Sequence, residues 1–306
     1  MERKSVRTGY LLLLPSVILI AALIVYPAVN TIYQSFFDIR TQTAALGPKF
    51  VGMKNYIRAF HDEHFWDTMW WTVAFTGVSV FIELVIGLGL ALVMKKNIPG
   101  QGIIRTAILV PWAIPTVVSG IIWTQFFSQN GLVNYIMQVM NLAEAPLNWL
   151  GNEWLARLSI LVADIWKNTP YMSLLLLSGL LTISTDYYEA AQLDGAGKWQ
   201  QFKCITLPLI RSTMSVTVLF RIISAMRVYD LIVAMTGGGP AGRTETVSMY
   251  AVNTYFTYGC LLYTSLGPGS ARLFGGRGFL PGPDFFARGL RGYGQGAPSI
   301  FRRGAL

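Results

Sequence analysis

Long apolar runs separated by short polar connections dominate this chain. Five of these runs have the roughly 20 residues that a membrane-spanning helix needs. They cover residues 10–33, 68–94, 105–127, 155–181 and 206–234. Apolar residues occupy most faces of each run, so length and low charge indicate membrane spans here better than helical periodicity does. We therefore predict an all-α fold, a polytopic bundle of transmembrane helices.

The composition also favours a membrane protein. Hydrophobic residues make up 53% of the chain and charged residues 13%, whereas charged residues make up roughly 25% of an ordinary soluble domain. The formal net charge of +9 would suggest a nucleic-acid partner if the chain were soluble. Basic cytoplasmic connections of a membrane protein produce the same excess. We predict that a lipid bilayer surrounds the chain and that nucleic acid is not a partner.

Basic residues near the ends of the apolar runs predict which side each connection faces. They precede the first run and lie in the second and fourth connections: Arg3, Lys4, Arg7, Lys95, Lys96, Arg105, Lys198, Lys203 and Arg211. By the positive-inside rule these segments are cytoplasmic, which predicts a multi-pass protein of the cell inner membrane with a cytoplasmic amino terminus. The first run is too long for a signal-peptide core, so we expect an uncleaved anchor, with cleavage as the alternative.

The connection between the fourth and fifth runs, the 183–208 loop, has the most informative pattern. Residues 189–196 read Glu-Ala-Ala-Gln-Leu-Asp-Gly-Ala, and Thr185 can cap a short helix there. Gly195 would cost roughly 1 kcal/mol inside a helix, so it predicts a turn before a second short helix. Pro208 suits the first turn of the fifth span. The loop is either an amphipathic helix at the membrane surface or a helix that docks on another protein.

This loop resembles the Glu-Ala-Ala loop of ABC importer permeases, in which a Gly and then Ile-x-Leu-Pro follow. Other segments resemble the sugar-type branch of these binding-protein-dependent permeases, which includes maltose, lactose and glycerol-3-phosphate importer subunits. They lie at residues 50–56, 109–115, 164–170, 229–232 and 236–240. The resemblance covers residues 10–259 and implies the fold of a type I ABC importer permease.

The resemblance implies a transport subunit with no catalytic or metal-binding residues. Its partners would be a second permease subunit, an ATP-binding cassette ATPase dimer and an extracytoplasmic solute-binding protein, with ATP and Mg bound by the ATPase. The 183–208 loop would couple ATPase closure to alternating access. The coupling residues would be Glu189, Ala190, Ala191, Asp194, Gly195, Ile205, Leu207 and Pro208. A permease for a non-sugar solute is the alternative. An ion-coupled carrier would need inverted repeats, which the sequence does not show.

Six charged residues fall inside the predicted spans, where charges usually face a protein interior or a water-filled path. They are Glu83, Asp164, Lys167, Arg221, Arg227 and Asp230. The i,i+3 spacing predicts that Asp164 pairs with Lys167 and that Arg227 pairs with Asp230. Structural pairing and a polar lining for the solute both remain open. On the second interpretation the solute path would contain Trp123, Ser224, Arg227, Tyr229 and Asp230, although Trp123 also suits a membrane interface.

Two further patterns concern breaks and turns. Pro111, Pro115 and Pro170 are expected to interrupt helices. Residues 236–240 read Thr-Gly-Gly-Gly-Pro and lack the Lys of a phosphate-binding loop, so they predict a turn at the outer exit of the fifth span. A membrane enzyme would need a convergent set of nucleophile, base or metal ligands, and the sequence shows none.

The character of the sequence changes after residue 259. Residues 260–306 contain six arginines, a single acid and frequent Gly and Pro, a composition typical of disorder. The family pattern places a sixth and last span here. We therefore divide the chain into a permease domain, residues 1–259, and a tail, residues 260–306. Our interpretation is that a frameshift or mis-assembly replaced the last span, and a genuine Arg/Gly-rich tail is the alternative.

Overall fold

The computed structural model describes residues 12–38, 48–96 and 99–258. The predictions for the basic amino terminus and for the tail after residue 259 lie outside these residues. The chain divides into two compact units, of which one contains the first helix up to Thr31 and the other contains residues 32–264. The first helix runs over Leu12–Gln34 and contains a π-helical turn, η1 (Ala21–Val25), followed by α2 (Tyr26–Gln34).

A small polar junction leads into the larger unit. Strand β1 (Phe37–Asp38) pairs antiparallel with β2 (Lys49–Phe50), and α3 (Lys54–Phe60) follows. The buried Asn55 side chain donates hydrogen bonds to the carbonyl oxygens of Ser35 and Phe37, at 2.9 and 3.0 Å. The segment at residues 50–56 therefore holds the chain that enters this unit against α3.

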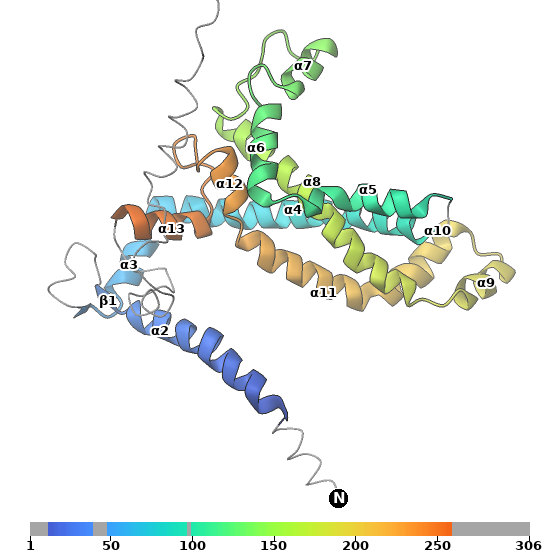
Figure 1. Cartoon of the computed structure of the whole chain (residues 1–306), viewed down its shortest axis with the longest axis horizontal. Coiled ribbons are helices and arrows are strands. Elements are labelled where there is room, and N and C mark those ends of the chain that lie inside the picture. Colours follow the sequence, from blue (N-terminus) through green and yellow to red (C-terminus); the bar gives the residue numbers. More distant parts are fainter. Residues whose placement is uncertain (1–11, 39–47, 97–98, 259–306) are drawn as a thin grey trace, which may run out of the picture. The chain divides into compact units, whose positions relative to one another are not determined.

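Three long helices form the centre of the larger unit: α4 (Glu63–Lys95), α8 (Glu153–Leu181) and α11 (Leu207–Met226). Asp62 and Asn152 cap the first two, because their side chains accept hydrogen bonds from backbone N–H groups of the first turn. Each central helix packs against the other two, and α5 (Gln101–Ala113) packs along α8 (Figure 1). This bundle confirms the predicted all-α fold.

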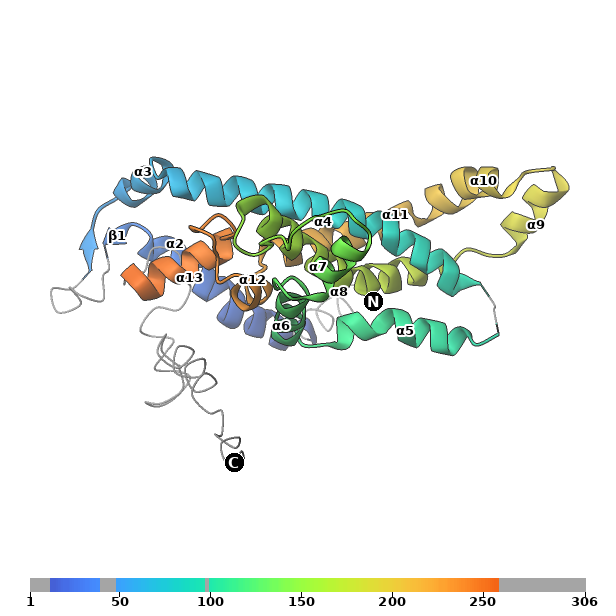
Figure 2. The same ribbon diagram turned by 90° about the horizontal axis from the view of Figure 1, so that it is seen from above.

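Shorter helices flank this bundle. Helix α6 (Thr116–Phe126) packs on α12 (Asp230–Met235), and α7 (Leu132–Val139) follows α6. Helix α13 (Val247–Tyr258) contacts α4. The 183–208 loop contains α9 (Asp186–Leu193), α10 (Lys198–Gln201) and a π-helical turn, η3 (Phe202–Thr206). Both views place this loop at the end of the larger unit that is opposite α3 and α13 (Figures 1 and 2).

Two apolar clusters form the core of the larger unit. One joins α4, α8 and α11 and includes Met94, Leu176, Leu180 and Ile210. The other lies around α12 and the first half of α8 and includes Phe75, Phe127, Ile160, Leu231 and Ile232. Small residues let these helices approach closely. A Cβ atom on Gly179 of α8 would lie 2.7 Å from the Thr213 Oγ1 of α11.

Three described helical segments are long and apolar enough to cross a membrane unbroken, namely Leu12–Gln34, Glu63–Lys95 and Lys198–Met226. Helices α5 and α6 would together make a fourth, but they are bent by 92°. The apolar run at residues 105–127 therefore forms a bent pair of helices, with the interruption that the sequence predicts at Pro115. The break falls at Ile114, whose ψ of 133° is extended, because a following proline disfavours the helical conformation. Helix α8 is long enough to span a membrane, with 29 residues, but its polar residues make it less apolar than these three segments.

The expected helix breaks at Pro111 and Pro170 are corrected. Pro111 and Pro170 lie inside α5 and α8, which continue through them, so Pro115 is the one of the three prolines that separates helices. The fifth span expected at residues 206–234 is also broken. Helix α11 ends at Met226 and α12 begins at Asp230, which leaves three non-helical residues between them.

Candidate functional site

The 183–208 loop is a helix–turn–helix segment that leads into α11. Gly195 has a φ of +80°, which favours glycine, and it lies between α9 and α10 as predicted. Thr185 occupies the N-cap position, but its side chain makes no capping bond. Instead the backbone N–H of Asp186 donates to Ser184 Oγ at 3.3 Å. Pro208 lies in the first turn of α11, which confirms its predicted position.

One face of this loop is unusually exposed. Glu189, Ala190, Gln192 and Asp194 are all exposed, and Leu193 is 91% exposed. Trp199 on α10 is 75% exposed and stacks on Phe202. Exposed apolar side chains that are surrounded by polar groups are typical of a protein-docking surface. The predicted coupling residues up to Gly195 thus lie on or beside this surface, whereas Ile205 packs against the core.

A polar cavity of about 180 Å³ lies at the break between α11 and α12. Its lining comes from α6, α8, α11, α12 and the residues between the last two. The lining residues are Thr116, Asp164, Lys167, Asn168, Arg221, Ser224, Arg227, Val228, Tyr229, Asp230 and Leu231. Four of the five residues predicted for a solute path therefore lie together in one cavity: Ser224, Arg227, Tyr229 and Asp230.

Trp123 lies elsewhere. Its ring packs among Phe126, Phe127 and Trp166, with ring centroids 5.5 to 5.7 Å apart, and it does not line the polar cavity. Its indole N–H is buried and has no hydrogen-bond partner among the described residues. The structure thus separates Trp123 from the other four candidates.

A buried ion network forms one wall of the polar cavity. Arg221 of α11 donates to Glu83 of α4, from Nε at 2.5 Å and from Nη2 at 2.8 Å. Its Nη2 also donates to Asp164 Oδ2 of α8, whose other oxygen accepts from Asn168 at 2.8 Å. The side chains of Arg221, Glu83 and Asp164 are at most 3% exposed. One guanidinium thus links the three central helices through bidentate and charge-assisted bonds.

Neither predicted i,i+3 pair forms a salt bridge among the residues that the structure describes. Asp164 pairs with Arg221, while Lys167 Nζ donates to the carbonyl oxygen of Ile114 at 2.5 Å. That oxygen is freed by the break between α5 and α6. Within the described ranges, Arg227 and Asp230 form no ion pair with each other, because α11 ends before Arg227 and the helical spacing does not apply.

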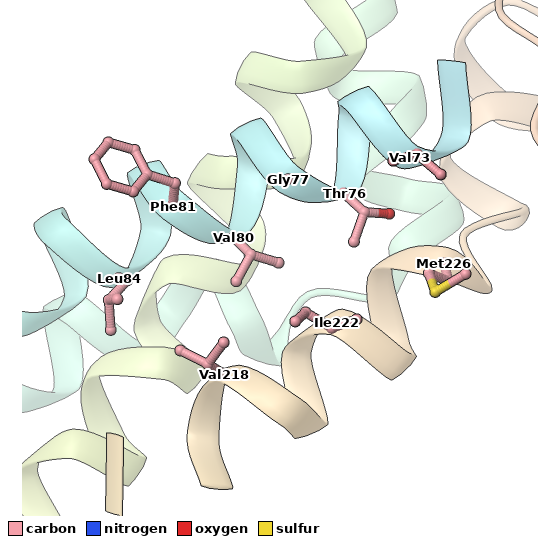
Figure 3. Close-up of a pocket in the computed structure, with 9 residues that line it drawn as sticks. All are labelled: Val73, Thr76, Gly77, Val80, Phe81, Leu84, Val218, Ile222 and Met226. Carbon is pink, nitrogen blue, oxygen red and sulfur yellow. The ribbon is translucent and has the colours of Figure 1, made fainter. Parts of the chain in front are cut away.

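An apolar groove of about 420 Å³ lies between α4 and α11 (Figure 3). It is lined by Val73, Thr76, Gly77, Val80, Phe81, Leu84, Val218, Ile222 and Met226. Val80 and Leu84 flank Glu83 along α4, and Val218 and Ile222 flank Arg221 along α11. The groove is therefore lined by apolar residues that neighbour Glu83 and Arg221 along their helices.

Comparison with known proteins gives consistent matches. The family described as binding-protein-dependent transport system inner membrane component matches residues 83–267. The trehalose/maltose transport system permease protein of Thermococcus litoralis is 39% identical over 256 residues, 83% of this chain and 85% of that protein. The sulfoquinovosyl glycerol transport system permease protein of Agrobacterium fabrum is 40% identical over 78% of this chain and 77% of that protein.

A solved structure has a similar fold. It is a chain of a bacterial ABC transporter involved in the import of the acidic polysaccharide alginate. This chain superposes on it with a TM-score of 0.71 at 22% sequence identity, over 89% of this chain and 91% of that chain. At this level of identity the likeness concerns the fold.

Proposed function

Because the chain belongs to the family of inner membrane components of binding-protein-dependent transport systems, we propose that it is the permease subunit of an ATP-driven importer of sugars or sugar-like solutes. The family makes it a multi-pass transport subunit and not an enzyme. The sugar class is supported by relatives that are named for trehalose/maltose and for sulfoquinovosyl glycerol transport. The observation that carries the proposal is the exposed α9 surface at one end of a bundle that encloses a polar cavity.

In the proposed assembly this chain pairs with a second permease subunit. An ATP-binding cassette ATPase dimer holds ATP and Mg and binds the exposed face of α9 around Glu189 and Leu193. An extracytoplasmic solute-binding protein delivers the solute to the opposite side. The amino terminus and the 183–208 loop then face the cytoplasm. Closure of the ATPase dimer moves the loop, and the bundle changes the side to which the cavity opens.

The lining of the polar cavity supports a hydroxyl-rich solute. Ser224 and Tyr229 offer hydroxyl groups, and Arg227 and Asp230 offer a donor and an acceptor. The three cationic lining residues, Lys167, Arg221 and Arg227, are balanced by two acidic lining residues and by Glu83 behind Arg221. The cavity thus offers hydrogen-bond donors and acceptors of both charges to the hydroxyl groups of a sugar.

The proposal is tested by uptake in cells that lack their own transporters for the test sugars. The cells express the chain together with its partner subunits and receive radiolabelled trehalose, maltose or a glycerol-linked sugar. Glu189→Lys and Gly195→Asp should each lower uptake at least tenfold while the protein remains in the membrane. The matched control is Glu144→Lys, an equal charge reversal at an exposed residue outside the loop. Normal uptake in both loop variants would defeat the assignment of the loop.

A further inference from the structure

The inner face of α9 is narrow and contains one large side chain. Of its eight residues, Tyr188 and Ala191 are half-buried and the other six are exposed. Tyr188 packs against the apolar cluster that joins α4, α8 and α11. The neighbouring Tyr187 is 58% exposed. Tyr188 is therefore the large side chain through which α9 contacts the bundle.

Tyr188 is held by polar contacts from two other elements. Its Oη lies 2.9 Å from Thr206 Oγ1, at the end of η3, and shares a hydrogen bond with it. Lys95, the last residue of α4, donates from Nζ to the same Oη at 3.4 Å and lies 4.6 Å from the centre of the Tyr188 ring. The Thr206 side chain is buried. A hydrogen bond and a cation–π contact thus join three elements at one phenol ring.

Both helices that meet Tyr188 lead to the polar cavity. The helical segment Lys198–Met226 is continuous. Thr206 and Arg221 therefore lie on the same helix, roughly 22 Å apart at the rise of an α-helix. Lys95 and Glu83 lie on α4, roughly 18 Å apart by the same rise. Glu83 and Arg221 in turn bond to each other beside the cavity. The contacts of Tyr188 therefore connect α9 to the ion network along two helices.

We infer that Tyr188, clamped by Thr206 and Lys95, is the positioning residue that fixes α9 to α4 and α11 and transmits its movement to the polar cavity. This inference rests on the proposed function of the 183–208 loop and adds the route by which the loop acts. Tyr188 itself touches neither the solute nor ATP. Loss of its hydroxyl group leaves the ring in the core but loosens α9 from both helices. ATP hydrolysis then continues with less solute moved per ATP.

The test compares four single variants and the double variant Tyr188→Phe/Thr206→Val in the complete transporter, reconstituted in proteoliposomes with its binding protein. Tyr188→Phe and Thr206→Val each remove the hydroxyl group of one partner in the hydrogen bond between these two residues. Thr206→Ser keeps the hydroxyl, and Tyr187→Phe is the matched control on the exposed face. The measurements are uptake of radiolabelled maltose and trehalose and the rate of ATP hydrolysis in the same vesicles.

We expect Tyr188→Phe and Thr206→Val each to lower the solute moved per ATP by about fivefold, the effect of one hydrogen bond on an equilibrium. The double variant should be no worse than Tyr188→Phe alone, because that change already removes the bond to Thr206 together with the one from Lys95. Thr206→Ser and Tyr187→Phe should keep the wild-type ratio. A merely structural role would lower protein yield but leave the ratio of uptake to hydrolysis unchanged.

The outcomes separate this inference from the proposed function. If Glu189→Lys uncouples the transporter while Tyr188→Phe and Thr206→Val keep the wild-type ratio, the inference fails and the function of the loop stands. A drop of about 25-fold in the solute moved per ATP by the double variant would also contradict the inference, because it would mean that the two hydroxyl groups act independently. If Glu189→Lys and Gly195→Asp both keep full uptake, the proposed function of the loop fails and takes this inference with it.

Discussion

The replacement of Arg221 by Met tests the buried ion network most sharply. Met fills much of the same volume but leaves Glu83 and Asp164 without their common partner, and both carboxylates are at most 3% exposed. Removing one partner of a buried ion pair costs about 3–5 kcal/mol. For a domain of this size, 1 kcal/mol shifts the unfolding temperature by about 2–4 °C. We therefore expect Arg221→Met to lower the unfolding temperature by about 6–20 °C.

The assay is thermal unfolding of the detergent-purified chain, followed by tryptophan fluorescence. The matched control removes all three charges together, as Glu83→Met, Asp164→Val and Arg221→Met. A buried ionic cluster replaced by apolar residues is often neutral or more stable, so this triple variant should unfold near the wild-type temperature. The reasoning is refuted if Arg221→Met unfolds within about 2 °C of the wild type, or if the triple variant loses as much as the single one.

Two further predictions concern helix packing and the polar cavity. Gly179→Ala should destabilise the chain by about 1–3 kcal/mol, because the added Cβ would press on Thr213. Gly77→Ala should be neutral, because nothing lies within 4 Å of the added atom. Thermal unfolding measures both variants, and equal effects would contradict the packing of α8 on α11. Asp230→Asn should raise the KM for solute uptake several-fold. Trp123→Phe should leave this KM unchanged, since Trp123 lies outside the cavity. A larger rise of KM in Trp123→Phe than in Asp230→Asn would contradict the assignment of the solute path to the polar cavity.

The local features of the 183–208 loop could be predicted from sequence because each follows from one residue. Gly195 needs a left-handed conformation to end α9, and Pro208 is favourable in the first turn of α11. The bend after Ile114 likewise follows from Pro115. The break between Met226 and Asp230 has no comparable signal, since neither Gly nor Pro occurs there. Helix α12 packs on α6 after this break, a tertiary contact that the local sequence does not reveal.

The ion network could not be predicted because its partners are distant in the sequence. Arg221 is 138 positions from Glu83 and 57 positions from Asp164. Spacing along one helix predicted a pair between Asp164 and Lys167 instead. Sequence reasoning identified the cost of each charge inside a span, but not which helices face one another. The same limit explains why Tyr188 was missed: its role depends on Lys95 and Thr206, which lie on other elements.

The central claim is that an ATPase binds the exposed face of α9. Site-directed cross-linking tests it most directly. In a chain with Cys204→Ser and Cys260→Ser, a cysteine is introduced at Leu193, and a second variant receives it at Leu142, which is 64% exposed outside the loop. In assembled transporter, a short bifunctional reagent should link Leu193→Cys to the ATPase subunit and leave Leu142→Cys unlinked. Failure of Leu193→Cys to cross-link, or equal linking from both positions, would contradict the account.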